Sequence, residues 1–159
     1  MDFIRGDITT MAVDAIVNAA NEQLTDGAGV NGAIHRAAGP QLAAVLRHMG
    51  GCATGEAVIT PGFDLPAEYV IHAVGPVWRG GEHGEAGLLA SAYQMSLLVA
   101  RAVGCKTIAF PAISCGIFRY PPAQAARIAV DTVRATALDE QVTFVLFSDE
   151  MLRVFQSAA

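Results

Sequence analysis

The hydrophobic residues of this chain gather in short runs that alternate with longer amphipathic stretches. The short runs are rich in apolar and β-branched residues and predict buried strands at 3–5, 15–20, 56–61, 68–76, 107–113 and 142–147. The longer stretches predict helices at 31–39, 40–49, 88–104, 123–137 and 149–156. Apolar strands separated by helices are typical of an α/β protein with a mostly parallel sheet that is covered on both faces.

Two of the predicted helices carry apolar residues at steps of three and four, and such a stripe predicts the face that packs on the sheet. In the helix at 88–104 the stripe consists of Leu88, Ala92, Met95, Val99 and Ala102. In the helix at 123–137 it consists of Ala126, Val130, Val133 and Ala137.

Composition narrows the class of protein. The 159 residues suit one folded domain, because 53% are hydrophobic and 16% charged. A net charge of −5 disfavours DNA binding. Three cysteines without CxxC spacing support neither a disulfide framework nor a zinc site. The chain has no membrane-length apolar run and no signal-peptide pattern at its start, so we expect a cytoplasmic protein.

Two glycine-containing loops, at 21–32 and 114–119, follow predicted strands. Ligands of open α/β sheets bind beyond the carboxyl ends of strands. Glycines allow backbone N–H groups to converge, and the start of a helix adds further donors, so an anion can be held there without lysine. These loops therefore predict a diphosphate site, with ordinary turn geometry as the alternative.

Two common nucleotide motifs do not account for these loops. Residues 27–32, GAGVNG, satisfy the dinucleotide pattern GxGxxG formally, but no convincing ribose-binding carboxylate follows about 20 residues later. A phosphate-binding P-loop is excluded because the pattern GxxxxGK[ST] does not occur.

Motifs spread along nearly the whole chain carry a family resemblance. They are GDIT at 6–9, VDAIVNAAN at 13–21, GVNGAIHRAAGP at 29–40, TGEA at 54–57, YVIHAVGP at 69–76 and FPAISCGIF at 110–118. In order and spacing the chain resembles the macrodomain family, in its MacroD-type ADP-ribosylhydrolase branch. The resemblance implies a single domain over 1–159, with a three-layer α/β/α fold around a mixed, mostly parallel sheet. It also implies an ADP-ribose cleft over the strand ends.

The resemblance also implies roles for individual residues. Asp7 and Ile8 would contact adenine, with Asp7 accepting from its amino group, and Phe147 would stack on the ring. Asn21 would contact the distal ribose, and Phe118 would cover it. The first diphosphate loop would be Gly27, Ala28, Gly29 and Val30, and the second Ser114, Cys115, Gly116, Ile117 and Phe118. Turn capping by Asp7 and core packing of the two phenylalanines are the structural alternatives.

Position 31 departs from the family pattern. Asn31 stands where the family has an aspartate that is assigned to activating or orienting water, and an amide cannot accept a proton as a general base. Asp26 and Ala28 replace glycines of the first loop, and Arg119 stands where the family often has glycine. Arg119 could contact phosphate or simply be a surface residue. Cys115 has no evident base beside it, and we interpret His35 and His72 as structural histidines.

Two functions therefore remain. The first is hydrolysis of mono-ADP-ribose from modified acidic side chains, or deacetylation of O-acetyl-ADP-ribose, with Asn21 and Asn31 as catalytic residues that orient the reactants. The second is a noncatalytic reader of ADP-ribosylated proteins, which Asn31 favours. Neither requires a metal or cofactor. The expected partners are ADP-ribose and ADP-ribosylated proteins, without DNA or membrane, and the expected state is a monomer.

Overall fold

A computed structural model describes all residues from 1 to 159. Its sheet has the order β1-β6-β5-β2-β4-β3. The strands are β1 (Asp2–Arg5), β2 (Ala15–Ala19), β3 (Ala57–Pro61), β4 (Tyr69–Ala73), β5 (Thr107–Phe110) and β6 (Gln141–Leu146). Every pairing is parallel except that of β3 with β4. The predicted mixed, mostly parallel sheet is confirmed.

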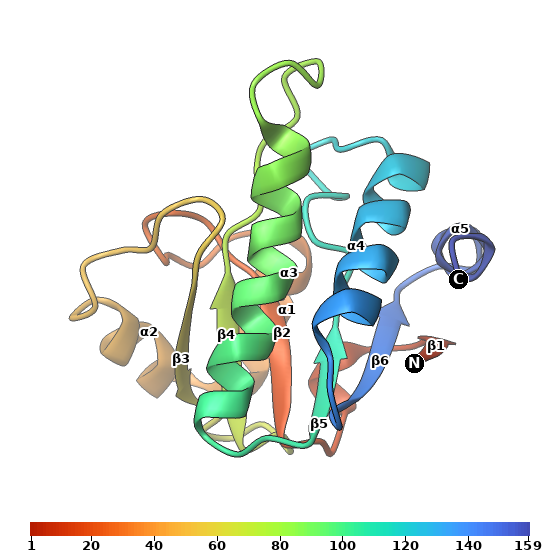
Figure 1. The fold of residues 1–159 in the computed structure, drawn as a ribbon. Coiled ribbons are helices and arrows are strands. Elements are labelled where there is room, and N and C mark those ends of the chain that lie inside the picture. Colours follow the sequence, from red (N-terminus) through yellow and green to blue (C-terminus); the bar gives the residue numbers. More distant parts are fainter.

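Helices cover both faces of this sheet, which confirms the three-layer α/β/α prediction (Figure 1). They are α1 (Gly29–Ala38), α2 (Pro40–Leu46), α3 (Glu85–Ala102), α4 (Pro122–Thr136) and α5 (Asp149–Ser157). A short 3₁₀ turn, η1 (Ile8–Thr10), follows β1. Helices α3 and α4 lie side by side on one face, and α1 and α2 cover the other. None of these helices has the length and apolar character needed to cross a membrane.

The sheet separates two hydrophobic cores. Successive residues of a strand point alternately into one core and into the other. In β2, Ala15 and Val17 face the core beneath α3 and α4, whereas Ile16 faces the core beneath α1 and α2. In β6, Phe144 and Val145 divide in the same way. This period of two is hidden in the sequence because both faces are apolar.

The predicted core face of α3 is wrong in its register. The fully buried positions are Leu89, Ala92, Tyr93, Ser96, Leu97 and Ala100, whereas Ala102 is exposed. The buried face includes polar side chains that have partners. The Ser96 hydroxyl donates to the Ala92 carbonyl at 2.7 Å, and the Tyr93 hydroxyl donates to the Pro111 carbonyl at 3.2 Å. The prediction counted only apolar residues and therefore placed the buried face of α3 at the wrong positions around the helix. For α4 the stripe is confirmed at Ala126, Val130 and Val133.

Two phenylalanines near the end of β6 allow a matched test of the core. Phe144 is fully buried and packs against Phe3, Tyr93, Phe110 and Phe155, whereas Phe147 is 66% exposed. We expect Phe144→Ala to lower the free energy of unfolding by about 3–5 kcal/mol, because it leaves a cavity. Phe147→Ala should change it by less than about 0.5 kcal/mol. Urea denaturation measures both, and equal losses would contradict the assignment of Phe144 to the core.

Candidate functional site

A pocket of about 610 Å³ lies at the edge of the sheet where the parallel strands end. Its walls come from the segments that directly follow β1, β2, β5 and β6, together with Gly75 after β4 and the start of α1. Parallel strands bring their carboxyl ends to one edge, so segments far apart in the sequence meet there. The predicted position of the cleft is confirmed.

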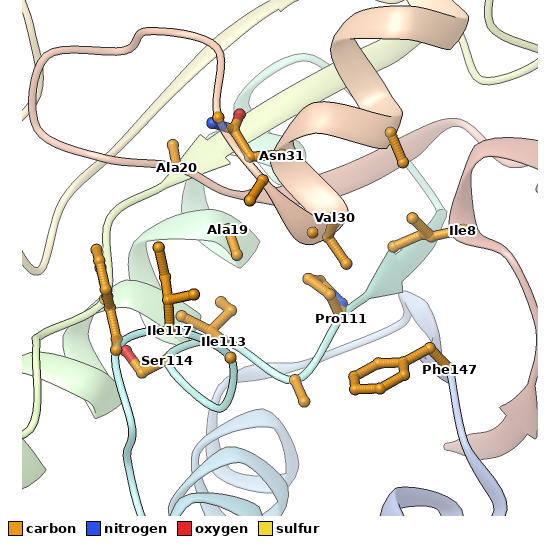
Figure 2. A pocket seen from close by; sticks show the side chains of 18 of the residues that line it. Ile8, Ala19, Ala20, Val30, Asn31, Pro111, Ile113, Ser114, Ile117 and Phe147 are labelled. Carbon is orange, nitrogen blue, oxygen red and sulfur yellow. The ribbon is translucent and has the colours of Figure 1, made fainter.

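Nearly all predicted site residues line this pocket. They are Asp7, Ile8, Asn21, Gly27, Ala28, Gly29, Val30, Asn31, Ser114, Gly116, Ile117, Phe118 and Phe147. Figure 2 shows Ile8 and Phe147 on one side of the pocket, and Ala20, Ser114 and Ile117 on the other. Their roles toward a ligand stay predictions.

Cys115 is the exception among the predicted residues. It does not line the pocket, and its side chain packs against the core beneath α3 and α4. Burial raises the pKa of its thiol to about 12, so the thiolate needed for nucleophilic attack is not formed at neutral pH. The side chain of Cys115 is turned toward the protein interior, so its predicted contact with a ligand is not supported.

The first loop leads directly into α1. Gly29 has φ of +60°, a value that favours glycine, and no side chain caps the helix at Ala28. Gly32, one turn on, lies so close to the Gly27 carbonyl that a Cβ would collide with it. The N-terminus of α1 therefore presents backbone donors to the pocket, and glycine is needed where the loop packs on the helix.

The second loop is tied to its neighbours at several points. The Ser114 hydroxyl donates to the Pro76 carbonyl at 2.8 Å, and the Trp78 amide donates to the Phe118 carbonyl at 2.8 Å. Ser114 and Arg119 have positive φ of 68° and 62° although neither is glycine. Ile117, at the tip, is 78% exposed. The loop is anchored at its two ends and presents its tip to solvent.

Asp7 caps the turn η1, as the structural alternative predicted, and it also lines the pocket. Its Oδ1 accepts from the Thr9 amide at 2.9 Å and from the Thr9 hydroxyl at 2.7 Å. Its Oδ2 accepts no hydrogen bond from the protein, so one acceptor remains for a ligand. For Phe147 the alternative of core packing is wrong, because the ring is exposed at the pocket wall.

The two asparagines are held by the same residue of the first loop. Asn21 accepts from the Thr25 amide at 3.0 Å and donates to the Thr25 carbonyl at 3.1 Å. Asn31 also donates to the Thr25 carbonyl, at 2.9 Å, and its Oδ1 accepts from Asn18 at 2.8 Å. Asn31 is 7% exposed. Both amides are therefore oriented by the protein before any ligand binds.

Charge is nearly absent from the pocket. Asp7 is the only charged residue in its lining, and no lysine or arginine contributes. Arg119 and Asp26 are exposed, and neither lines the pocket. The Asp26 carboxylate accepts a hydrogen bond from the Gly27 amide at 2.7 Å. The structure holds no cluster of three or more histidine, cysteine or acidic residues that could bind a metal ion. An anion in this pocket would have to be bound by backbone N–H groups and by the side-chain amides of Asn21 and Asn31.

Several lining residues were missed by the sequence analysis. They are Gly6, Ala19, Ala20, Ala33, Gly75, Pro111, Ala112, Ile113 and Val145. Most are small or apolar, so no chemical signal marks them. Gly75 is needed because a Cβ there would collide with Ile113 and with Ser114 of the second loop, a contact that only the folded structure reveals.

Glu85 supports the second loop from a distance. It is buried at the start of α3, and its carboxylate accepts from the amides of Arg79, Gly81 and His83 at 2.9, 3.0 and 2.6 Å. These bonds shape the segment that begins at Trp78, whose amide holds Phe118. Burial by itself raises the pKa of Glu85, but the backbone hydrogen bonds outweigh it and lower the pKa to about 2.

We expect Glu85→Gln to destabilise the protein at pH 7, because one amide oxygen cannot replace a carboxylate that accepts from three donors. The native pKa lies below the ordinary value of 4.5, so this stabilisation is present above pH 4.5 and is lost as the pH falls toward 2. The difference between the two proteins in urea denaturation should therefore shrink over that range. The exposed Glu82→Gln is the control, and a difference that is independent of pH would contradict the assignment.

Comparisons with known proteins agree with this arrangement. Residues 17–129 match the Macro domain family. An O-acetyl-ADP-ribose deacetylase of Enterobacter cloacae is 55% identical over 164 residues, which cover 98% of this chain and 91% of the relative. The Oceanobacillus iheyensis macrodomain with ADP superimposes with a TM-score of 0.94 at 38% identity, covering 98% of this chain and 87% of that one.

A second solved structure, the Trypanosoma brucei macrodomain in complex with ADP-ribose, superimposes with a TM-score of 0.90 at 38% identity. The match covers 98% of this chain and 67% of that one. The family model matches most of the chain, and the relative and the two solved structures each match 98% of it. The chain therefore belongs to the macrodomain family.

Proposed function

We propose that this chain binds ADP-ribose in the pocket and acts as a hydrolase on ADP-ribose esters. Its substrates would be proteins mono-ADP-ribosylated on acidic side chains, O-acetyl-ADP-ribose, or both. The observation that carries the proposal is a pocket without lysine or arginine, bounded by two loops whose backbone suits a diphosphate. The name of the Enterobacter cloacae relative and the ligands of the two solved structures support this choice.

Adenine would occupy the end of the pocket formed by Ile8 and Phe147. The exposed Phe147 ring offers a stacking surface, and the free Oδ2 of Asp7 can accept from the adenine amino group. The diphosphate would lie between the loops at 27–30 and 114–118. In this arrangement the distal ribose extends toward Asn21 and Asn31.

Hydrolysis of either substrate breaks an ester of the distal ribose. Water adds across that bond and leaves a carboxylate and a ribose hydroxyl. Asn21 and Asn31 would orient the ribose and the water, since an amide cannot act as a general base. Rate enhancement would come from positioning and from backbone donors that are already in place.

A noncatalytic reader is the second candidate, and Asn31 is the observation that favours it. As a reader, the chain would bind ADP-ribosylated proteins without removing the ADP-ribose. The two candidates predict the same binding and differ only in turnover. A cytoplasmic monomer is compatible with either.

Gly116 and Gly87 provide a matched test of the pocket. A Cβ added at either position meets no atom within 4 Å, and neither has positive φ, so both should accept leucine without unfolding. Gly116 lines the pocket, whereas Gly87 lies on the exposed surface of α3. We expect Gly116→Leu to abolish ADP-ribose binding in calorimetry and Gly87→Leu to bind as the unchanged protein does. Equal affinity in both variants would show that the ligand binds elsewhere.

Single-turnover hydrolysis separates the two candidates. We expect ADP-ribose to be released from a protein mono-ADP-ribosylated on glutamate, or acetate from O-acetyl-ADP-ribose, above the rate without protein. The Gly116→Leu variant should remove this activity, which excludes a contaminating enzyme. Binding of ADP-ribose without release from either substrate would identify a reader instead.

A further inference from the structure

A row of buried polar side chains runs through the otherwise apolar layer beneath α1. Thr60 and His72 are in contact at 3.0 Å between Oγ1 and Nε2, and Asn18 Nδ2 lies 3.2 Å from His72 Nδ1. Asn18 Nδ2 also donates to Asn31 Oδ1 at 2.8 Å. Thr60, His72, Asn18 and Asn31 are all buried, with exposures of 3%, 0%, 0% and 7%. We call this row the buried polar chain.

The strand register places these residues together. Asn18 in β2 and His72 in β4 are direct partners across the parallel pairing, so their side chains project from the same face of the sheet. Thr60 comes from the neighbouring strand β3. Asn31 comes from the first turn of α1, above this face. The buried polar chain therefore connects an edge strand to the helix start that borders the pocket.

The Thr25 carbonyl determines the direction of every hydrogen bond in the buried polar chain. A carbonyl only accepts, so Asn31 turns Nδ2 toward Thr25 and Oδ1 toward Asn18. Asn18 must then present its NH₂ group, and its second N–H reaches His72 Nδ1. His72 consequently carries its proton on Nε2, which faces Thr60.

Two further observations agree with this direction. Asn18 Oδ1 is buried without a partner, because the orientation that turns the NH₂ group toward Asn31 and His72 points the oxygen away from both. Turning the Asn18 amide over would set its oxygen against Asn31 Oδ1, which is itself an acceptor. Burial, with a smaller contribution from His35, lowers the pKa of His72 to about 3, so the ring stays neutral.

We propose that Asn18 and His72 are positioning residues that act through the Asn31 amide to hold the first loop at Thr25, and that this arrangement requires an amide at position 31. A carboxylate there would direct one oxygen at the Thr25 carbonyl, where Asn31 now donates at 2.9 Å. Asn31 is therefore matched to its neighbours and is more than a lost general base. This inference rests on the proposed function, in which that loop binds the diphosphate.

The first experiment is a double-mutant cycle on ADP-ribose affinity measured by calorimetry. Asn18→Asp conserves shape but removes both donors of the amide. We expect it to weaken binding about tenfold or more, and to have no further effect in a protein that carries Asn31→Ala. An equal loss in both backgrounds, or no loss in a folded Asn18→Asp protein, would overturn the proposal.

Asn31→Asp tests the requirement for an amide in the same assay. We expect weaker ADP-ribose binding and no gain in single-turnover hydrolysis, because the carboxylate and the Thr25 carbonyl repel each other. Unchanged or tighter binding, or faster hydrolysis, would instead make position 31 the site of a missing base.

A spectroscopic test on the unchanged protein keeps the proposal falsifiable if the variants do not fold. The ¹⁵N chemical shifts of the His72 ring should report an unprotonated Nδ1 and a protonated Nε2 at neutral pH. A proton on Nδ1 would exclude the hydrogen bond from Asn18. Failure of the unchanged protein to bind ADP-ribose would contradict the proposed function, whereas this shift tests the buried polar chain independently.

Discussion

Whatever anion enters this pocket must be held without a positive side chain, because no lysine or arginine lines it. Backbone N–H groups are the main remaining donors, and they act together only if two loops from distant parts of the chain keep a fixed geometry. Much of the surrounding structure serves that constraint. Gly32 allows the first loop to pack on α1, and Gly75 allows the second loop to pack on the end of β4.

Hydrogen-bonded polar side chains, most of them outside the pocket lining, support the two loops. On one side the buried polar chain links β3, β4 and β2 to Asn31, and Asn31 contacts the first loop through Thr25. On the other side Glu85 shapes the segment before α3, and the Trp78 amide of that segment holds the second loop at Phe118. Buried polar networks of this kind favour one arrangement of their members, although the Asn18 Oδ1 acceptor is left without a partner. Each loop thus has its own support behind the pocket wall.

Sequence patterns predicted the strands, the helices and 13 of the 22 residues that line the pocket, because apolar runs, glycine loops and family motifs are local signals. They failed where a signal depends on neighbours in space. Cys115 lies between two lining residues of the second loop, but its side chain turns into the core. The core face of α3 includes Tyr93 and Ser96, whose hydroxyls find acceptors only in the folded protein. Small lining residues such as Ala19 and Ala20 carry no chemical signal at all.

The sequence by itself determined the α/β class, the family and the location of the two loops at strand ends. Only the tertiary structure decided which hydrogen bonds the side chains of Asn18 and Asn31 make. Asn18, Asn31 and His72 are three unconnected polar residues in the sequence, and the parallel pairing of β2 with β4 beneath α1 turns them into one chain of hydrogen bonds. The physical reason is that the direction of a hydrogen bond depends on the partner at each end. Here the partner that decides it is a backbone carbonyl, which no side-chain pattern reveals.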